Sequence, residues 1–239
     1  MPVITLLQTP PDEPIKGQIL QMVVDYLTDI SSVALPPSNP LYSLYQYGIG
    51  YEVHLYLEAL SGARGIPVEL LVATDEQDPS RLLGFVLYLP VQDDPQACAV
   101  AYMAVLAGHR RQGIARALLG QVRERYPHVE LACAVGKVAY FEAMGFQVLG
   151  ARGPQVLMNT RDHATEGLLA VLDVAPIYRT LEVQQIHAYL LKQHGKRAMV
   201  DAEKQRDRHL DQLTRQARAF VQQRLGDTGA QAAASLRLV

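Results

Sequence analysis

The stretch HRRQGIARALL, residues His109 to Leu119, joins a basic glycine turn directly to the start of an apolar helix. It follows an apolar run of strand length at 97–106, and we expect the helix to cover 113–126. A strand that leads into a glycine turn and a helix start directs several free backbone N–H groups at one point, with the helix dipole behind them. Gly113 allows a ligand to approach the backbone, and the flanking arginines offer charge to phosphate oxygens. Alone, the turn is typical of an ordinary helix start; after this strand, it predicts a pyrophosphate cradle.

The rest of the sheet is predicted by working outward from this stretch. Three apolar runs, 68–75, 81–90 and 97–106, are separated by acidic, proline-containing turns, which indicates an antiparallel meander. Around the meander we expect these elements in chain order: a strand in 1–7, helices over 15–30 and 50–62, a strand at 129–135, a helix at 137–144, and strands near 146–150 and 154–159. The fold class is therefore α/β (α+β), with a mixed, mostly antiparallel central sheet flanked by helices.

The C-terminal third has a different pattern, because strand signals cease after about residue 160. We expect helices over 164–174, 179–194 and about 199–225. The predicted organisation is a first domain over 1–160, an all-helical extension over 161–225 and a frayed tail over 226–239. The last helix has an apolar seam that must be buried either on the domain or on a second copy, so a homodimer through the C-terminal helices stays open. The seam residues are Leu210, Leu213, Ala217 and Phe220.

Composition narrows the function classes. The 239 residues have a net charge of −2, which argues against a protein whose main task is to bind nucleic acid. The two cysteines, Cys98 and Cys133, form neither a disulfide framework nor a zinc spacing, and the histidines make no metal set. No signal peptide and no run of membrane-spanning length is present, so we expect a cytoplasmic protein without a membrane partner.

Two motifs in the expected order carry a family resemblance. The segment YMAVLAGHRRQGIARALL resembles motif A of the GNAT superfamily of acyl-CoA-dependent N-acetyltransferases, with Arg110, Gly113 and Ala115 at the signature positions. The segment VAYFEAMGF, 138–146, resembles the next motif of that family, a short helix with an aromatic pair that ends in Gly-Phe. The resemblance covers about residues 1–160 and implies acetyl-CoA as the donor substrate, no metal, and an amine on a small molecule or protein as the acceptor.

The resemblance also implies the residues of the donor site. The backbone amides from Gln112 to Arg116 would hold the pyrophosphate, and the strand from Met103 to Val105 would pair with pantetheine where two strands splay apart. The N–H of Val105 would then face the thioester carbonyl and stabilise its developing charge during direct attack by a neutral amine. The positions carried over are Met103, Ala104, Val105, Arg110, Arg111, Gln112, Gly113, Ile114, Ala115 and Arg116.

The catalytic residues are less well defined. Phe141 occupies the position of the tyrosine that protonates the leaving thiolate in many relatives, and the neighbouring Tyr140 is either that acid or a packing residue. The amine must lose a proton, and the candidates for this step, each with a structural alternative, are Tyr102, Glu52, Glu58 and Glu130. Because the usual acid and base are missing, the alternative to an enzyme is a GNAT-like domain that binds CoA and acts as an interaction scaffold through its helical tail.

A stretch rich in tyrosine, 41–51, is expected to be a loop between the first two helices, where the family commonly covers its acceptor pocket. Its tyrosines either line a pocket for an aromatic or cationic acceptor or pack the loop onto the sheet. They are Tyr42, Tyr45, Tyr47 and Tyr51.

Overall fold

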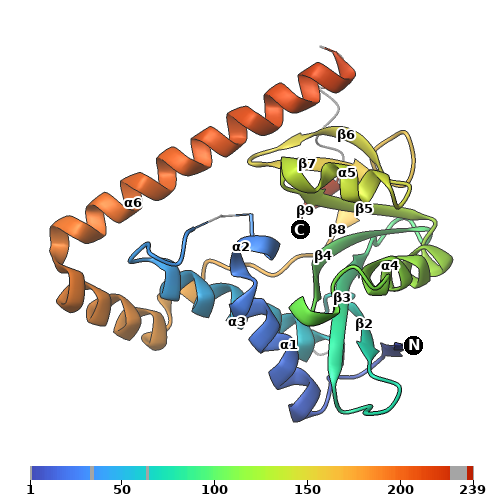
Figure 1. Ribbon diagram of the computed structural model, residues 1–239, viewed down its shortest axis with the longest axis horizontal. Helices are drawn as coiled ribbons and strands as arrows, with labels where there is room; N and C mark the ends of the chain where they lie inside the picture. Colours follow the sequence, from blue (N-terminus) through green and yellow to red (C-terminus); the bar gives the residue numbers. More distant parts are fainter. Residues whose placement is uncertain (1, 33–34, 63–64, 227–235, 239) are drawn as a thin grey trace.

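A seven-stranded sheet forms the centre of the computed structural model, which describes residues 2–32, 35–62, 65–226 and 236–238 (Figure 1). Its strands lie in the order β1-β2-β3-β4-β5-β7-β6, and each neighbouring pair is antiparallel except β4 and β5. The strands are β1 Val3–Leu7, β2 Glu69–Thr74, β3 Leu82–Pro90, β4 Ala97–Val105, β5 His128–Cys133, β6 Gln147–Arg152 and β7 Gln155–Asn159. The predicted meander and the mixed, mostly antiparallel sheet are both confirmed.

Helices cover both faces of this sheet. The α-helices and the short 3-10 helices (η) are α1 Glu13–Asp25, α2 Leu27–Ile30, α3 Tyr42–Ala59, η1 Ala107–His109, α4 Ile114–Arg125, η2 Val135–Lys137, α5 Val138–Glu142, η3 Ile177–Arg179 and α6 Leu181–Leu225. One apolar core lies between the sheet and α1 and α3, around Leu57 and Phe85. A second core lies on the opposite face beneath α4 and α5, around Leu118 and Phe141. The sheet is therefore the middle of three layers.

The prediction of a loop over 41–51 is wrong, because α3 begins at Tyr42. The prolines that prevent a helix end at Pro40, and the residues that follow are free to turn. Gly48 lies within the helix at a close contact, since a Cβ built there would lie 2.9 Å from the Tyr178 hydroxyl. The tyrosine-rich stretch therefore belongs to the first half of a helix. The helix expected over 15–30 is divided at Tyr26 into α1 and α2.

The helix predicted over 164–174 is also wrong, so the extension is not wholly helical. The chain forms strand β8, Gly167–Leu169, whose Leu168 carbonyl accepts a hydrogen bond from the Gln92 N–H. It pairs in parallel with β9, Leu236–Leu238, and these tertiary contacts override the local helical pattern. The expected frayed tail lies mostly on 227–235, outside the described residues, while 236–238 are in β9.

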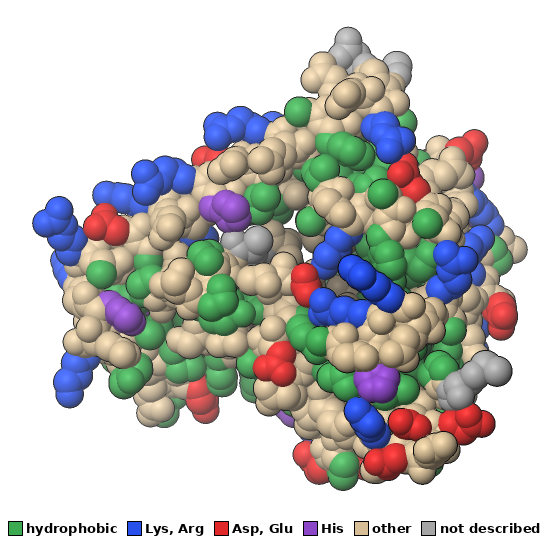
Figure 2. All heavy atoms as spheres, viewed as in Figure 1, with side chains coloured by type: hydrophobic (Ala, Val, Ile, Leu, Met, Phe, Trp, Pro, Cys, Tyr) green, Lys and Arg blue, Asp and Glu red, His purple; other side chains and the backbone are tan. Residues whose placement is uncertain are grey.

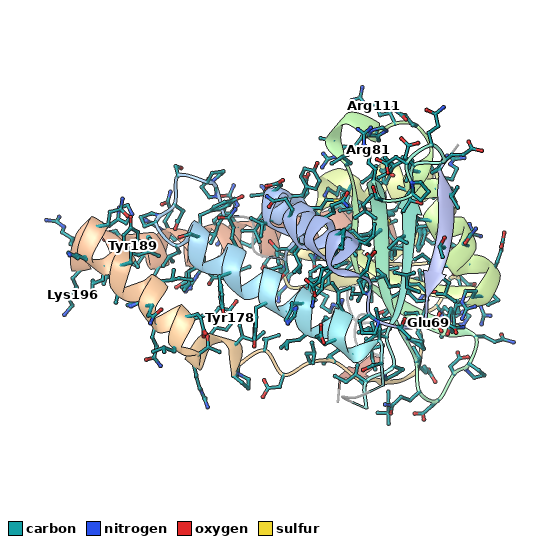
Figure 3. All side chains as sticks on the ribbon, turned by 90° about the horizontal axis from the view of Figure 1, so that it is seen from below. Glu69, Arg81, Arg111, Tyr178, Tyr189 and Lys196 are labelled. Carbon is teal, nitrogen blue, oxygen red and sulfur yellow. The ribbon has the colours of Figure 1, made fainter. Side chains whose placement is uncertain are left out.

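Helix α6 bends at Gly195, where φ is 79°, and connects two parts of the molecule. Before the bend, Leu190 packs with Leu35 and Leu41 ahead of α3. After the bend, the helix crosses to β6 and β7, where Ala217 and Val221 are buried in the core that also contains α4 and α5. Figure 3 shows Tyr189 and Lys196 at the end of the molecule far from Arg111. The end of the apolar seam is thus buried on the protein's own sheet, which was one of the two predicted alternatives.

Candidate functional site

Strand β4 separates from β5 where a bulge begins. The two strands pair in parallel only from Ala97 to Ala99, opposite His128 to Glu130. On the other side of β4, Leu87 of β3 lies opposite Tyr102 and Tyr88 lies opposite Val100, so Ala101 is an extra residue. A bulge bends its strand and increases the local twist. The second half of β4 therefore leaves a cleft beside β5.

The turn after β4 presents unpaired N–H groups beside this cleft. Arg111 (φ 64°) is the one non-glycine residue with positive φ in the described chain, and Gly113 (φ 82°) precedes α4. The first backbone donor with a helical acceptor is Ala117, whose N–H reaches the Gly113 carbonyl at 2.9 Å. No side chain in the described residues caps α4, so the first N–H groups of the helix face outward at its positive end. A Cβ at Gly113 would meet no atom within 4 Å, so the space above the turn is open.

The cleft and the turn open into one pocket of about 730 Å³, a size typical of small-molecule sites. Figure 2 shows basic side chains gathered around a hollow in this face of the molecule. Nine of the ten residues predicted for the donor site line the pocket: Met103, Ala104, Val105, Arg110, Arg111, Gly113, Ile114, Ala115 and Arg116. The tenth, Gln112, is outside the described lining, and its side-chain amide donates to the Gly108 carbonyl at 3.4 Å.

Glu52 and Tyr102 meet at the interface between α3 and the sheet. The Tyr102 hydroxyl hydrogen bonds to the Glu52 carboxylate. Burial raises the pKa of Glu52, and the bond to Tyr102 opposes that rise. Burial and the nearby Glu52 charge raise the pKa of the Tyr102 hydroxyl well above its ordinary value. Ala101 and Met103, the sequence neighbours of Tyr102, line the pocket, whereas Tyr102 itself packs against the core between the sheet and α3.

Residues 67–148 match the family model of the acetyltransferase (GNAT) domain, from just before β2 to the start of β6. The chain carries a GNAT domain. The bulged strand, the turn and α4 all lie inside the matched segment.

Solved structures of acetyltransferases match the chain to different degrees. The PaiA N-acetyltransferase from Thermoplasma acidophilum, in complex with coenzyme A, gives a TM-score of 0.51 at 10% identity, with 66% of this chain and 99% of that chain covered. The GNAT family N-acetyltransferase YhbS from Escherichia coli, in complex with CoA, gives 0.42 at 21% identity, with 67% and 82% covered. Nourseothricin acetyltransferase gives 0.33 at 22% identity; 38% of this chain is covered and 64% of that chain, less than two thirds of its length. No curated protein matches the sequence. The first of these structures supports the GNAT fold.

Within the GNAT domain, Tyr140 and Phe141 have different surroundings. Phe141 is 7% exposed and packs against Phe146, with ring centroids 5.9 Å apart. Tyr140 is 50% exposed and lines the pocket. Burial raises the pKa of its hydroxyl, and the Arg116 charge lowers it. The structure thus places Tyr140 in the pocket wall, while Glu52 and Tyr102 are outside the described lining.

The four tyrosines near the start of α3 contact the C-terminal segments and one another. The Tyr45 hydroxyl accepts from Arg206 of α6 at 2.9 Å, and its ring lies 6.4 Å from that of Tyr178. The rings of Tyr47 and Tyr51 stack at 5.7 Å. Tyr42 packs against the small core that contains Leu190. These observations favour packing, the second of the two predicted roles, and the described lining of the 730 Å³ pocket contains none of the four.

The other side chains of the domain that could react include the two cysteines and His109. Cys98 and Cys133 are both buried and unpaired. Burial raises the pKa of the Cys133 thiol to about 12, so this residue stays protonated beside the pocket that it lines. His109 contacts Arg81 at 3.2 Å between Nε2 and Nη2. No cluster of three His, Cys, Asp or Glu that could hold a metal ion occurs among the described residues, and no described helix is long and apolar enough to cross a membrane.

Other parts of the pocket wall were not predicted from the sequence. They include Asp29 of α2, Lys137 at the end of η2, and Leu213 and Gln216 of α6. Asp29 and Lys137 are charged, but neither belongs to a motif that can be recognised in the sequence. Leu213 was identified only as part of an apolar seam. Their common location depends on tertiary packing, which no local pattern records.

Proposed function

We propose that this protein is an acetyl-CoA-dependent N-acetyltransferase that transfers the acetyl group to an amine by direct attack on the thioester. The single observation that carries the proposal is that the bulged, splayed half of β4 and the open turn before α4 border the same pocket. The first offers unpaired strand backbone beside a cleft, and the second offers N–H groups and cations for phosphate.

In this proposal the donor lies along the pocket. The turn from Arg110 to Arg116 binds the pyrophosphate, and the free edge of β4 from Met103 to Val105 binds pantetheine through backbone hydrogen bonds. A backbone N–H on that edge faces the thioester carbonyl oxygen. A fixed donor at this place stabilises the oxygen more as it gains negative charge than in the ground state, and this difference accelerates the reaction.

Glu52 is the proposed base, and Tyr102 positions it. A neutral amine is required for attack, and a carboxylate whose pKa is raised by burial is a better acceptor for its proton than an exposed carboxylate. Tyr140 is the proposed donor of a proton to the leaving thiolate, because it is the tyrosine in the pocket wall. The acceptor is an amine on a small molecule or a protein. Two unpaired thiols are typical of a reducing compartment, and we keep the cytoplasm as the proposed location.

Binding of the donor can be tested by thermal unfolding with acetyl-CoA. A ligand that binds only the folded state raises the Tm, so we expect a rise at millimolar acetyl-CoA. Gly113→Glu should abolish the rise, because its side chain enters the open space above the turn and adds negative charge. Gly62→Glu is the matched control, since Gly62 also has a positive φ (74°) and open space around its Cβ, lies outside the described pocket lining, and should keep the rise. No rise in the unmodified protein would overturn the proposal.

The second candidate is a domain that binds CoA without efficient turnover. It is favoured by the absence of a carboxylate on β4 and by the bond that holds Tyr102 to Glu52. Release of free CoA, measured against a broad panel of amines and peptides, separates the two functions. An acceptor that releases CoA supports the enzyme, whereas donor binding with no turnover across the panel supports the scaffold.

A further inference from the structure

Asp29 of α2 contacts cations on both sides of the cleft. Its Oδ2 lies 3.1 Å from the Arg110 Nη2, in the turn after β4. Its Oδ1 lies 3.6 Å from the Lys137 Nζ, at the end of η2 after β5. The Lys137 ammonium also donates to the Asp29 backbone carbonyl. One carboxylate thus joins the two chain segments that follow the diverging strands.

The Asp29 segment is held firmly on the β4 side. The Tyr26 hydroxyl accepts from the Ala107 N–H at 2.8 Å, and the Arg110 guanidinium lies 4.6 Å from the centre of the Tyr26 ring. Arg110 Nε donates to the Val105 carbonyl at 3.2 Å. On the β5 side, Lys137 contacts this segment through the Asp29 carboxylate and backbone carbonyl. Figure 1 shows the corresponding position of α2 beside β4.

These charges lie where a phosphate would meet them. Asp29, Arg110 and Lys137 all line the pocket, as do Gly113 and the first residues of α4. The three side chains are between 40% and 45% exposed, and ion pairs with this exposure are weak. The pyrophosphate of CoA carries about two negative charges, against one on a carboxylate, and its oxygens accept several charge-assisted hydrogen bonds. It can therefore replace Asp29 as the ion-pair partner of both Arg110 and Lys137.

We infer that Lys137 is a phosphate-binding residue of the donor site. In the free protein its ammonium is paired with the Asp29 carboxylate, and a phosphate of CoA replaces that carboxylate on binding. This inference rests on the proposed function and adds a second phosphate-binding edge to the pocket, opposite the glycine turn. Asp29 acts against the ligand in two ways, because it neutralises two cations and repels the incoming phosphate. Its removal must therefore strengthen binding, whereas the removal of Lys137 must weaken it.

The test is the dissociation constant of CoA, measured by titration calorimetry. We expect Lys137→Met to weaken binding about tenfold, the scale of one charge-assisted hydrogen bond, and Lys137→Arg to restore most of it. We expect Asp29→Asn to strengthen binding about threefold, and the gain should shrink at high salt. Lys192→Met on α6 and Asp25→Asn at the end of α1 are the controls for the two charge changes, and each should bind as the unmodified protein does.

A second ligand identifies which phosphate Lys137 contacts. An equal loss with CoA and 3′-dephospho-CoA would assign it to the pyrophosphate, and a loss with CoA alone would assign it to the 3′-phosphate; both outcomes support the inference. Unchanged CoA binding in Lys137→Met would overturn the inference. Weaker binding in Asp29→Asn would also overturn it. Each variant is a test by itself, so the inference can still be overturned if the other variant fails to fold. An unmodified protein that binds no CoA would instead overturn the proposed function.

Discussion

The Tyr102 hydroxyl on β4 and the Glu52 carboxylate on α3 form a hydrogen bond between the sheet and the helix that covers it. A partly buried carboxylate beside an apolar sheet costs stability, and this placement points to a chemical role. The bond also fixes the direction in which Glu52 can take a proton. Four predictions test this pair and the packing that supports the site.

Glu52→Gln should lower kcat by about 10²- to 10⁴-fold, the range expected for loss of a general base. The amide keeps the size of the side chain and cannot accept the proton of the amine. Steady-state rates with an acceptor found in the panel provide the measurement, and Glu58→Gln is the control, because Glu58 lies on the same helix in an ion pair with Lys16. Thermal unfolding at pH 7 should show no loss of stability in Glu52→Gln, because the raised pKa of Glu52 means that its charge opposes folding. A normal rate would remove Glu52 from the mechanism.

Tyr102→Phe should move the acid limb of the kcat/KM profile to higher pH. Glu52 must be deprotonated to act as a base, so activity rises with pH through its pKa, which burial places above the usual range for glutamate. The bond from Tyr102 lowers that pKa, and its removal raises the pKa further. A profile measured from pH 4 to 9 checks the shift. An acid limb that stays in place would show that another group controls it.

Replacing Phe141 and Tyr140 by alanine should have opposite consequences. Phe141→Ala removes a buried ring from the core beside Phe146 and should cost about 3–5 kcal/mol of unfolding free energy. Tyr140→Ala should change stability by less than about 1 kcal/mol, because half of its side chain is exposed, and should lower kcat instead. Urea unfolding and initial rates distinguish them. A stable Phe141→Ala variant would contradict this division of roles.

The turn between β4 and α4 could be predicted because its signals are local. A strand-length apolar run, a glycine and an amphipathic helix lie within about thirty residues, and each part can be recognised from the sequence. The bulge at Ala101 has no such signal, since the residues around it are small and apolar like the rest of β4. The contacts of Asp29 with Arg110 and Lys137 join three distant segments, so no periodicity reports them.

The errors in the predicted helices have a similar origin. The start of α3 was missed because four tyrosines and two glycines lower the local helix preference, while packing against Tyr178 and the Leu190 core supplies the stability. Strand β8 was assigned to a helix because its apolar residues suit either structure. Its partner β9 lies more than sixty residues later, beyond the reach of a window read from sequence.

Val221→Asp should detach the end of α6 from the sheet. Val221 is 1% exposed and packs in the core shared with β6 and α5, and an unpaired carboxylate there costs several kcal/mol unless it is protonated or the helix moves away. Because Leu213 and Gln216 line the pocket about two turns and one turn earlier on α6, CoA binding should weaken together with stability. Thermal unfolding and calorimetry measure the two effects, and Gln223→Asp is the control, since that position is exposed on the same turn. If Val221→Asp lowered the Tm but left CoA affinity unchanged, α6 would support the sheet without forming part of the donor site.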